Sequence, residues 1–323
     1  MACDGSNLTI APNLNDPETL WKSNQLGATG NHLHLNALYD VLNRTYIDAL
    51  VQTASMYQEH RACIQMIERV TLDKVILIAD RGYENYNIMS HAIEKGWKFL
   101  IRIKDVHSNG IASGLELPQT AVFDMDINLI LTRNQTKSKK QAGYKFMPTV
   151  QTFDYLPIGS KEDYPIFFRI ARFKIADDSY ETVITNLDRF CFSAEKLKEL
   201  YHLRWGIETS FRELKYAIGL TSFHAKKVDY IKQEIFARLT LYNYCELITT
   251  YVVEHTENIS KKNQVNFTIA IYICREYLRR KRKLRPPDVV KLIEKHILPI
   301  RPGRRDPRKV KPQASVSFLY RVA

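Results

Sequence analysis

Four polar side chains recur within one stretch of the sequence: Tyr201, Arg204, Glu208 and Lys215. Ser193 is a suitable N-cap residue with Glu195 in the first turn, which predicts a single helix over about 194–217. At about 100° per residue, the four side chains share an arc of about 60° on that helix. A carboxylate among cations is a common way to hold a metal ion beside phosphates, so this face predicts phosphate chemistry.

The adjoining face of the same helix is apolar. It carries Leu200, Leu203, Ile207, Phe211 and Leu214, the spacing of a stripe that packs on a core. The alternative interpretation of the charged face is a solvated surface with an i,i+4 ion pair.

A second polar group, Asp80-Arg81-Gly82-Tyr83, directly follows the apolar run at 75–79. The run predicts a buried strand, and the pattern continues as a helix closed by Gly96 and a strand over 97–103. Gly82 is expected to supply backbone freedom in the tight turn. Polar residues at the carboxyl ends of such strands are where open α/β sheets place ligands, although a simple turn aspartate explains the pattern as well.

The helix and the aspartate resemble known motifs. Tyr201, Arg204, Glu208 and Lys215 match the YREK signature of a group of bacterial insertion-sequence transposases (the IS-four-like group) of the DDE superfamily. The sequences Leu203–Glu208 and Phe211–Lys215 are also similar to that group, and Asp80–Tyr83 is similar to its second catalytic block. The resemblance covers essentially the whole chain, with the usual upstream DNA-binding domain absent.

This resemblance implies an α/β fold: a ribonuclease-H-like core with a β-rich insertion and a C-terminal helical, basic extension. The predicted divisions are 1–104 and 191–258 for the two parts of the core, 105–190 for the insertion and 259–323 for the C-terminal region. The family carries Asp-Gly-Ser at the end of its first core strand, which makes Asp4 the counterpart of its first catalytic carboxylate.

The resemblance also implies the chemistry. Asp4, Asp80 and Glu208 would be the catalytic residues and would hold two Mg²⁺ ions, with Mn²⁺ as an alternative. The expected activity is cut-and-paste transposition of an insertion sequence, by phosphodiester hydrolysis and strand transfer at the element ends. The residues expected to bind the DNA are Tyr201, Arg204, Trp205 and Lys215. Stacking on a flipped base, which an insertion tryptophan performs in some relatives, would need Trp205 or a tyrosine or phenylalanine of the insertion.

Only three residues precede Asp4, and a central strand normally has about 5–6 residues. We therefore expect Asp4 at a frayed end, in a chain that folds and binds DNA but cleaves terminal repeats weakly. On this interpretation an upstream segment in frame would restore cleavage at least about tenfold. Two alternatives remain: a truncated, inactive copy that interferes with an intact transposase, and a general nuclease of the same fold.

Composition bounds these interpretations. The chain has 323 residues and a net charge of +12, and the segment 275–311 holds 15 Lys and Arg against 4 Asp and Glu. Such a block suits a polyanion such as DNA. The resemblance implies that this DNA is the element's terminal repeats and target DNA, with two chains expected to pair on it. Five scattered cysteines predict reduced core thiols in a cytoplasmic protein, and no apolar run approaches the length of a membrane span.

The remaining elements follow from periodicity. Residues 7–30 are expected to form a loop, and 32–39 with 45–51 a hairpin. Helices are predicted over 56–69, 231–253, 267–278 and 288–296, with an extended basic segment at 301–309. His32 and His34 invite a metal-ligand interpretation, and ordinary surface residues are the alternative. A basic loop, which touches either DNA or only solvent, contains Arg133, Lys137, Lys139, Lys140 and Lys145.

Overall fold

The computed structural model describes residues 1–22, 29–106, 108–136, 143–255, 263–280 and 285–299. Its main feature is one mixed sheet in the order β2-β3-β1-β5-β6-β10-β9-β7-β8, with β4 also paired to β3. The strands are β1 (Ala2–Ile10), β2 (Leu20–Lys22), β3 (Thr29–Asp40), β4 (Thr45–Thr53), β5 (Ile76–Ala79), β6 (Lys98–Arg102), β7 (Phe123–Thr132), β8 (Tyr144–Phe146), β9 (Asp163–Ala176) and β10 (Ser179–Thr185).

The centre of the sheet has the strand directions of a ribonuclease-H-like core. β1 is antiparallel to β3, β3 is antiparallel to β4, and β1, β5 and β6 run parallel. The predicted hairpin is confirmed, and its turn is closed by the Asp40 carboxylate, which accepts hydrogen bonds from the backbone N–H groups of Leu42 and Asn43. The expected fold class is therefore confirmed.

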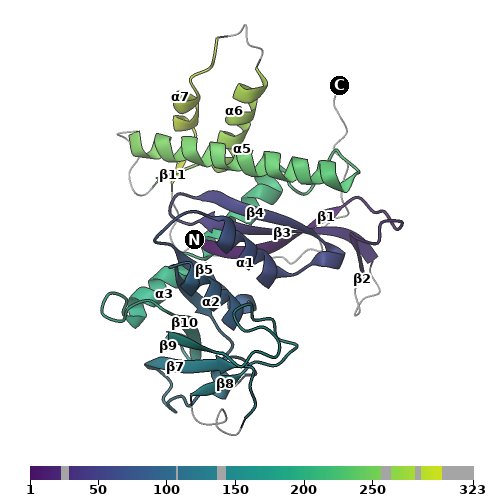
Figure 1. Cartoon of the computed structure of the whole chain (residues 1–323). Helices are drawn as coiled ribbons and strands as arrows, with labels where there is room; N and C mark the ends of the chain where they lie inside the picture. Colours follow the sequence, from purple (N-terminus) through teal and green to yellow (C-terminus); the bar gives the residue numbers. More distant parts are fainter. Residues whose placement is uncertain (23–28, 107, 137–142, 256–262, 281–284, 300–323) are drawn as a thin grey trace.

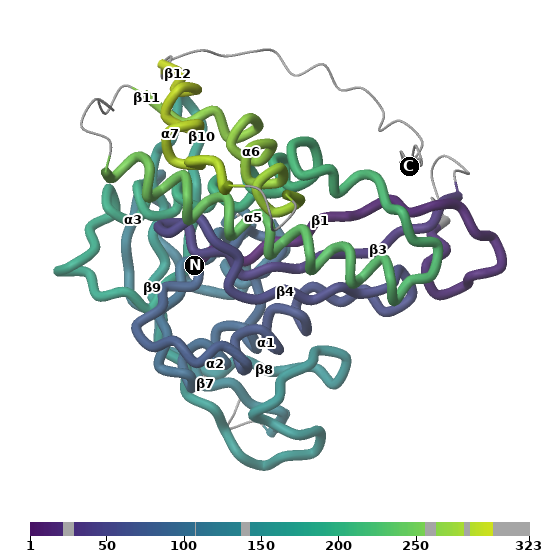
Figure 2. Tube along the Cα trace, turned by 90° about the horizontal axis from the view of Figure 1, so that it is seen from above, coloured from purple at the N-terminus to yellow at the C-terminus, as the bar shows by residue number. Residues whose placement is uncertain are grey.

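Helices cover both faces of these strands. α1 (Glu59–Arg69) and α2 (Tyr86–Glu94) pack on one face through an apolar cluster that includes Met66, Met89 and Phe99. Gly96, with a φ of 75°, ends the α2 turn as predicted. The opposite face is covered by α4 (Trp205–Glu213) and α5 (Val228–His255) through a second cluster. Figure 1 shows α5 lying across the β1–β4 region, and Figure 2 shows it running along β3.

The β-rich region extends the core sheet and does not form a sheet of its own. β10 pairs antiparallel with β6, with Val183 opposite Arg102, and β9 and β7 follow in antiparallel order. Because the sheet is continuous, backbone hydrogen bonds hold the strands of the insertion in place relative to the core strands. The exact domain boundaries given above stay a prediction.

The C-terminal part is helical. α5 is followed by α6 (Phe267–Arg279) and α7 (Val289–Glu294), and a small ribbon joins β11 (Asn263–Val265) to β12 (Ile297–Pro299). In Figure 1, α6 and α7 stand beyond α5, on the side away from the sheet. These helices match the predicted ones, whereas the segment 301–309 lies outside the described residues.

Of the loop expected over 7–30, only 11–19 lies outside the strands among the described residues, because 7–10, 20–22 and 29–30 belong to β1, β2 and β3. The frayed position expected for Asp4 is wrong. β1 continues through Ile10 and pairs with β3 along its whole length, from Ala2 opposite Tyr39 to Ile10 opposite Asn31. Alternate side chains such as Leu8 and Ile10 are buried, so the strand gains its contacts after Asp4, where the sequence had suggested only polar turns. The doubt about activity that rested on a frayed strand loses its physical basis.

The single helix expected over 194–217 is wrong as well. The structure has α3 (Ala194–His202), a tight turn at Leu203 and Arg204, α4, and a π-helical turn over Leu214–Ile218. The reason is that α3 and α4 pack on different clusters, Leu197 of α3 against the β9–β10 strands and Ile207 of α4 against the hairpin side.

Two side chains differ from their predicted burial. Leu203 stands at the junction of α3 and α4 and is 39% exposed, although it belongs to the predicted core stripe. Among the cysteines, Cys3, Cys63, Cys245 and Cys274 are buried free thiols as predicted, but Cys191 is exposed. Cys191 lies in the turn before α3, where it meets no core element.

Candidate active site

The register of two parallel strands places Asp4 beside Asp80. The pairing of β1 with β5 ends where Cys3 stands opposite Ala79, and the next residue on each strand is one of the two aspartates. β5 ends at Ala79, whereas β1 continues to Ile10, so the two carboxylates stand where β1 extends past the carboxyl end of β5. The carboxyl ends of such strands are where α/β sheets hold ligands. On its other side Asp4 is paired with Ala37 of β3, which fixes its backbone.

The Asp4 carboxyl group is mostly enclosed, with 23% of its side chain exposed. Its Oδ1 accepts a hydrogen bond of 2.8 Å from the backbone N–H of Gly5. Burial, with smaller effects from the Asp80 and Glu208 carboxylates, raises the pKa of Asp4 to about 6, although the Gly5 N–H and Arg204 act in the opposite direction. The Asp80 and Glu208 carboxylates are thus close enough to Asp4 to act on its charge.

Asp80 caps the short 3₁₀ turn Arg81–Tyr83, and its Oδ1 accepts a hydrogen bond of 2.8 Å from the backbone N–H of Gly82. The predicted need for special backbone freedom at Gly82 is wrong, because Gly82 is not among the residues with positive φ. Glycine is required here for space: a Cβ at position 82 would lie 2.9 Å from Asp80 Oδ1. The close contact between Gly82 and the Asp80 carboxylate fixes the direction of the Asp80 side chain.

Three side chains that the sequence did not reveal support this turn. His60 of α1 bonds the carbonyl oxygen of Gly82 through Nε2 at 2.5 Å, and Asn85 lies 3.2 Å from its Nδ1. A neutral His60 with its proton on Nε2 satisfies both contacts, since it then donates to Gly82 and accepts from Asn85. Glu84 accepts hydrogen bonds from the backbone N–H groups of Lys104 and Ile111. His60 gave no sequence signal because 22 residues separate it from Gly82.

Arg204 joins the strand side of the site to the helix side. Its Nη2 lies 2.7 Å from Glu208 Oε1, and its Nη1 lies 3.8 Å from Asp4 Oδ2. The guanidinium carbon is also 5.6 Å from the Tyr201 ring centre and 5.3 Å from that of Trp205. Only 7% of the Arg204 side chain is exposed, whereas the Glu208 side chain is 34% exposed. Arg204 therefore neutralises carboxylates in a partly enclosed position and keeps Glu208 at the open side.

The structure brings most of the predicted residues together. Tyr201 is buried and Trp205 is 46% exposed, so Trp205 presents its ring to the surface next to Arg204. Lys215 lies farther along, on the π-helical turn, and is half-buried. Burial lowers the pKa of Lys215, and its ammonium group forms no ion pair with another described residue. Arg204 Nε is buried and also has no hydrogen-bond partner within the described ranges.

The donor set of this site fits a hard divalent cation in its chemistry. The carboxylates of Asp4 and Asp80 on the sheet and of Glu208 on α4 are the kind of oxygen ligand that Mg²⁺ and Mn²⁺ prefer, and a cation eases their mutual repulsion. In the arrangement described, Arg204 is the cation that contacts Glu208 and Asp4. Across the described part of the chain, no three His, Cys, Asp or Glu side chains are grouped closely enough to hold a metal ion.

A buried ionic network stands behind α4. Arg44, from the hairpin turn, bonds Glu246 of α5 at 2.8 Å, and the Tyr242 hydroxyl lies 3.0 Å from Glu213 Oε2 of α4 and 3.2 Å from Glu246 Oε1, so it can donate to either. The Glu246 side chain is 1% exposed. Burial raises the pKa of Glu246 to about 7, and Arg44 opposes this effect. Apolar patterning along α5 gave no sign of a buried glutamate, so the sequence analysis missed it.

Two sites considered from the sequence have other roles. His34 lies 2.7 Å from Asn7 Oδ1 and 3.1 Å from Glu59 Oε1, and the ring of His32 stacks on Trp21. The alternative interpretation of both as ordinary surface residues is wrong for His34, which is 4% exposed. In the basic loop, Arg133 donates to four backbone carbonyl groups, including those of Leu156 and Pro148, so it braces the insertion. Lys137, Lys139 and Lys140 lie outside the described residues.

Comparison with known proteins gives the class of protein. The family model described as a transposase DDE domain matches residues 1–244. The chain therefore belongs to the transposase DDE domain family, a conclusion consistent with carboxylates on β1, directly after β5 and on α4. The finer subgroup, with its Tyr-Arg-Glu-Lys signature, stays a prediction.

One relative and one solved structure give the nearer comparisons. The chain is 23% identical over 178 residues to a probable transposase for insertion sequence element IS5377 of Geobacillus stearothermophilus. The match covers 54% of this chain and 40% of that relative, so the chain spans less than half the length of the protein that it resembles. It is similar in fold to a piggyBac transposase solved as a synaptic complex with hairpin DNA, with a TM-score of 0.50, 10% identity, and coverage of 94% of this chain and 59% of the other.

The described helices also bear on the predicted absence of a membrane span. None of them is both long enough and apolar enough to cross a membrane.

Proposed function

We propose that the protein is a DNA transposase that cuts and joins strands at the ends of an insertion sequence. The observation that carries the proposal is the position of Asp4 and Asp80, each directly after the last paired residue of the β1–β5 ladder, together with the Arg204–Glu208 pair at α4. Family membership and the fold of the solved relative support it. We further propose that two chains pair on the DNA, in the cytoplasm, with terminal repeats and target DNA as substrates.

In this proposal the three carboxylates of Asp4, Asp80 and Glu208 are the metal ligands, for two Mg²⁺ or Mn²⁺ ions. The bound ions would supply activation of the attacking oxygen and stabilisation of the leaving oxygen in phosphodiester cleavage and strand transfer. The protein contributes the direction of each carboxylate: strand pairing sets Asp4, the turn to Gly82 sets Asp80, and Arg204 sets Glu208.

The remaining residues hold the DNA. Arg204 has a buried Nε without a partner among the described residues and is suited to a phosphate oxygen. Lys215 carries an ammonium group that forms no ion pair within the described ranges, and burial lowers its pKa. Trp205 is exposed and can stack on a base beside the cleaved strand, whereas Tyr201 is buried and supports Arg204 by ring contact. These groups position the substrate and leave proton transfer to the carboxylate centre.

The decisive experiment measures cleavage of the element's own terminal repeats with Mg²⁺. Glu208→Ala removes one carboxylate and is expected to slow cleavage at least about 10³-fold, or about 4 kcal/mol in the barrier. Its binding to the same DNA is expected to stay within about twofold, because the cationic contacts are retained.

Glu199→Ala is the matched control, because Glu199 is an exposed glutamate of the neighbouring helix α3. Cleavage by this variant should equal that of the wild type. Equal nicking by the wild type and Glu208→Ala would remove the catalytic assignment. Cleavage of DNA without terminal repeats at the same rate would indicate a general nuclease.

A further inference from the structure

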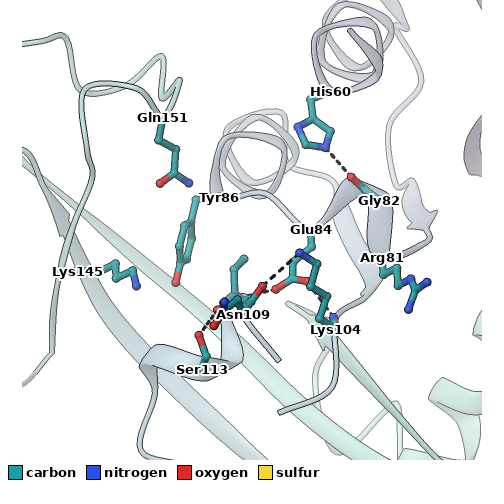
Figure 3. A pocket seen from close by; sticks show the side chains of 12 residues that line it. His60, Arg81, Gly82, Glu84, Tyr86, Lys104, Asn109, Ser113, Lys145 and Gln151 are labelled. Atoms are coloured by element: carbon teal, nitrogen blue, oxygen red, sulfur yellow. Dashed lines mark hydrogen bonds between the residues drawn. The ribbon is translucent and has the colours of Figure 1, made fainter. Parts of the chain in front are cut away.

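A pocket of about 550 Å³ lies beside the turn that follows Asp80, and its walls come from core and insertion. Arg81 and Gly82 belong to the turn itself, and Lys145 lies on β8 of the insertion. Figure 3 shows Tyr86 in the middle of this group, with Lys145 and Gln151 on one side and Lys104 and Asn109 on the other. The pocket is therefore next to the candidate active site but is not part of it.

The hydroxyl of Tyr86 is the feature that points to a ligand. Tyr86 is 2% exposed, and its hydroxyl is buried with no hydrogen-bond partner among the described residues. A buried polar group without a partner costs about 1–3 kcal/mol, so its retention calls for a partner that comes from outside the chain. The hydroxyl can donate one hydrogen bond into the pocket.

The charges around this hydroxyl select an anion. The lining contains the ammonium groups of Lys104 and Lys145 and one carboxylate, that of Glu84. Glu84 is already engaged by the backbone N–H groups of Lys104 and Ile111. Gly110 allows this close contact, since a Cβ there would lie 2.5 Å from Glu84 Oε1. The Glu84 carboxylate is thus held at the pocket wall, and the side chains that face the open space are hydrogen-bond donors and cations.

We infer that this pocket binds a backbone phosphate of a DNA strand that passes Asp80. Lys145 and Lys104 would neutralise the phosphate and Tyr86 would donate a hydrogen bond to one of its oxygens, while the amides of Asn109 and Gln151 line the space beside it. The inference rests on the proposed function only in taking DNA as the substrate. The same chain segment carries Asp80 and the pocket wall, so strand binding and cleavage are coupled by four residues of backbone, Asp80–Tyr83.

The test measures DNA affinity of the whole protein without divalent metal, so that no cleavage takes place. The probes are a fluorescein-labelled single strand of mixed sequence and the duplex of the same sequence, each over a range of salt concentrations. Tyr86→Phe removes only the hydroxyl and is expected to weaken binding of the preferred probe about tenfold. Its free energy of unfolding should not fall, because the lost group has no partner in the protein.

Lys145→Gln provides a second variant with a different signature. Losing one phosphate contact should reduce the slope of log affinity against log salt by about one. Lys161→Gln removes the same charge from an exposed site in the insertion and is the control, with an unchanged slope. The probe on which Tyr86→Phe and Lys145→Gln act identifies the form of DNA that enters the pocket.

The outcomes separate this inference from the proposed function. Unchanged affinity and slope in both variants would overturn the phosphate site, as would a loss of stability in Tyr86→Phe. A wild-type protein that binds neither probe would overturn it too. If Glu208→Ala cleaves normally but Lys145→Gln lowers the salt slope, the catalytic assignment fails and the phosphate site stands.

Discussion

Asp4 and Asp80 stand on the strand side of the candidate site, and Glu208 stands on the helix side. On the strand side the carboxylates are fixed by backbone: β1 pairs with β3 and β5, and Gly82 donates to Asp80. The groups that support this side, such as His60 at the Gly82 carbonyl, contact backbone atoms. On the helix side, Glu208 is held by an ion pair with Arg204.

A second set of charged side chains, behind α4, also holds the helix side in place. α4 is joined to α5 through Glu213, Tyr242 and Glu246, and Arg44 from the hairpin completes this network. A carboxylate whose position is set by backbone hydrogen bonds is held in a way that depends little on pH. A carboxylate that is positioned by buried charged groups depends on the protonation of those groups. The comparison therefore predicts that the placement of Glu208 responds to pH and charge substitutions, and that the placement of Asp80 responds to steric change.

The largest expected effect concerns the buried charge of Glu246. Its pKa in the folded protein is raised to about 7, above the ordinary value of 4.5, mainly by burial. Between these values the folded state holds a proton that the unfolded state has released, so the free energy of unfolding falls as pH rises through this window. The full difference corresponds to about 3 kcal/mol. Glu246→Gln should abolish this part of the pH dependence, measured by denaturant unfolding between about pH 4 and pH 8.

Glu254→Gln is the control for this prediction, because Glu254 is an exposed glutamate near the end of the same helix. It should keep the wild-type dependence on pH. If Glu246→Gln lost stability with rising pH as steeply as the wild type, the helix side would not be charge-dependent in the way described.

The second effect tests the strand side by adding one methyl group. In Gly82→Ala the new Cβ would stand 2.9 Å from Asp80 Oδ1, so the carboxylate or its turn must shift. Misplacing a reacting group on this scale costs about 10²-fold in rate, and we expect that loss in terminal-repeat cleavage. The free energy of unfolding should change by less than about 1 kcal/mol, because position 82 needs no positive φ.

Gly30→Ala offers a comparison on β3, where the added Cβ would meet ordinary contacts, with His32 Nε2 at 3.5 Å. Its cleavage rate should match that of the wild type. A Gly82→Ala protein that cleaves at the full rate would show that the close approach does not set the direction of Asp80.

The same contrast explains what could be predicted from the sequence. Asp80 and the strand before it were predictable because an apolar run that ends in a polar turn is a local signal. The signature helix was predictable in its residues but not in its shape. The break at Leu203 arises because α3 and α4 meet different clusters, through Leu197 and Ile207, and this is a property of the tertiary fold.

Other features were hidden for related reasons. β1 was predicted to end near Asp4, because Asp-Gly-Ser-Asn is turn-like in composition, yet pairing with β3 holds it extended to Ile10. Glu246 is a single acid within an apolar helix, and its partner Arg44 is 202 residues away along the chain. Contacts of that separation leave no periodic trace in the sequence.

The smallest expected effect lies where the two sides meet, at Arg204. Arg204→Lys keeps a positive charge between Asp4 and Glu208 but loses the planar fork that contacts both, at 3.8 Å and 2.7 Å. An ammonium group can hold one of the carboxylates well, so we expect cleavage to slow about tenfold, or about 1.4 kcal/mol. The salt dependence of DNA binding should stay the same, because the number of cations is unchanged.

Arg212→Lys, at an exposed position of the same helix, should alter neither quantity. If Arg204→Lys reduced the slope of log DNA affinity against log salt, Arg204 would act in phosphate neutralisation alone. If its cleavage rate were unchanged, a positive charge without the planar guanidinium would be enough to place Glu208.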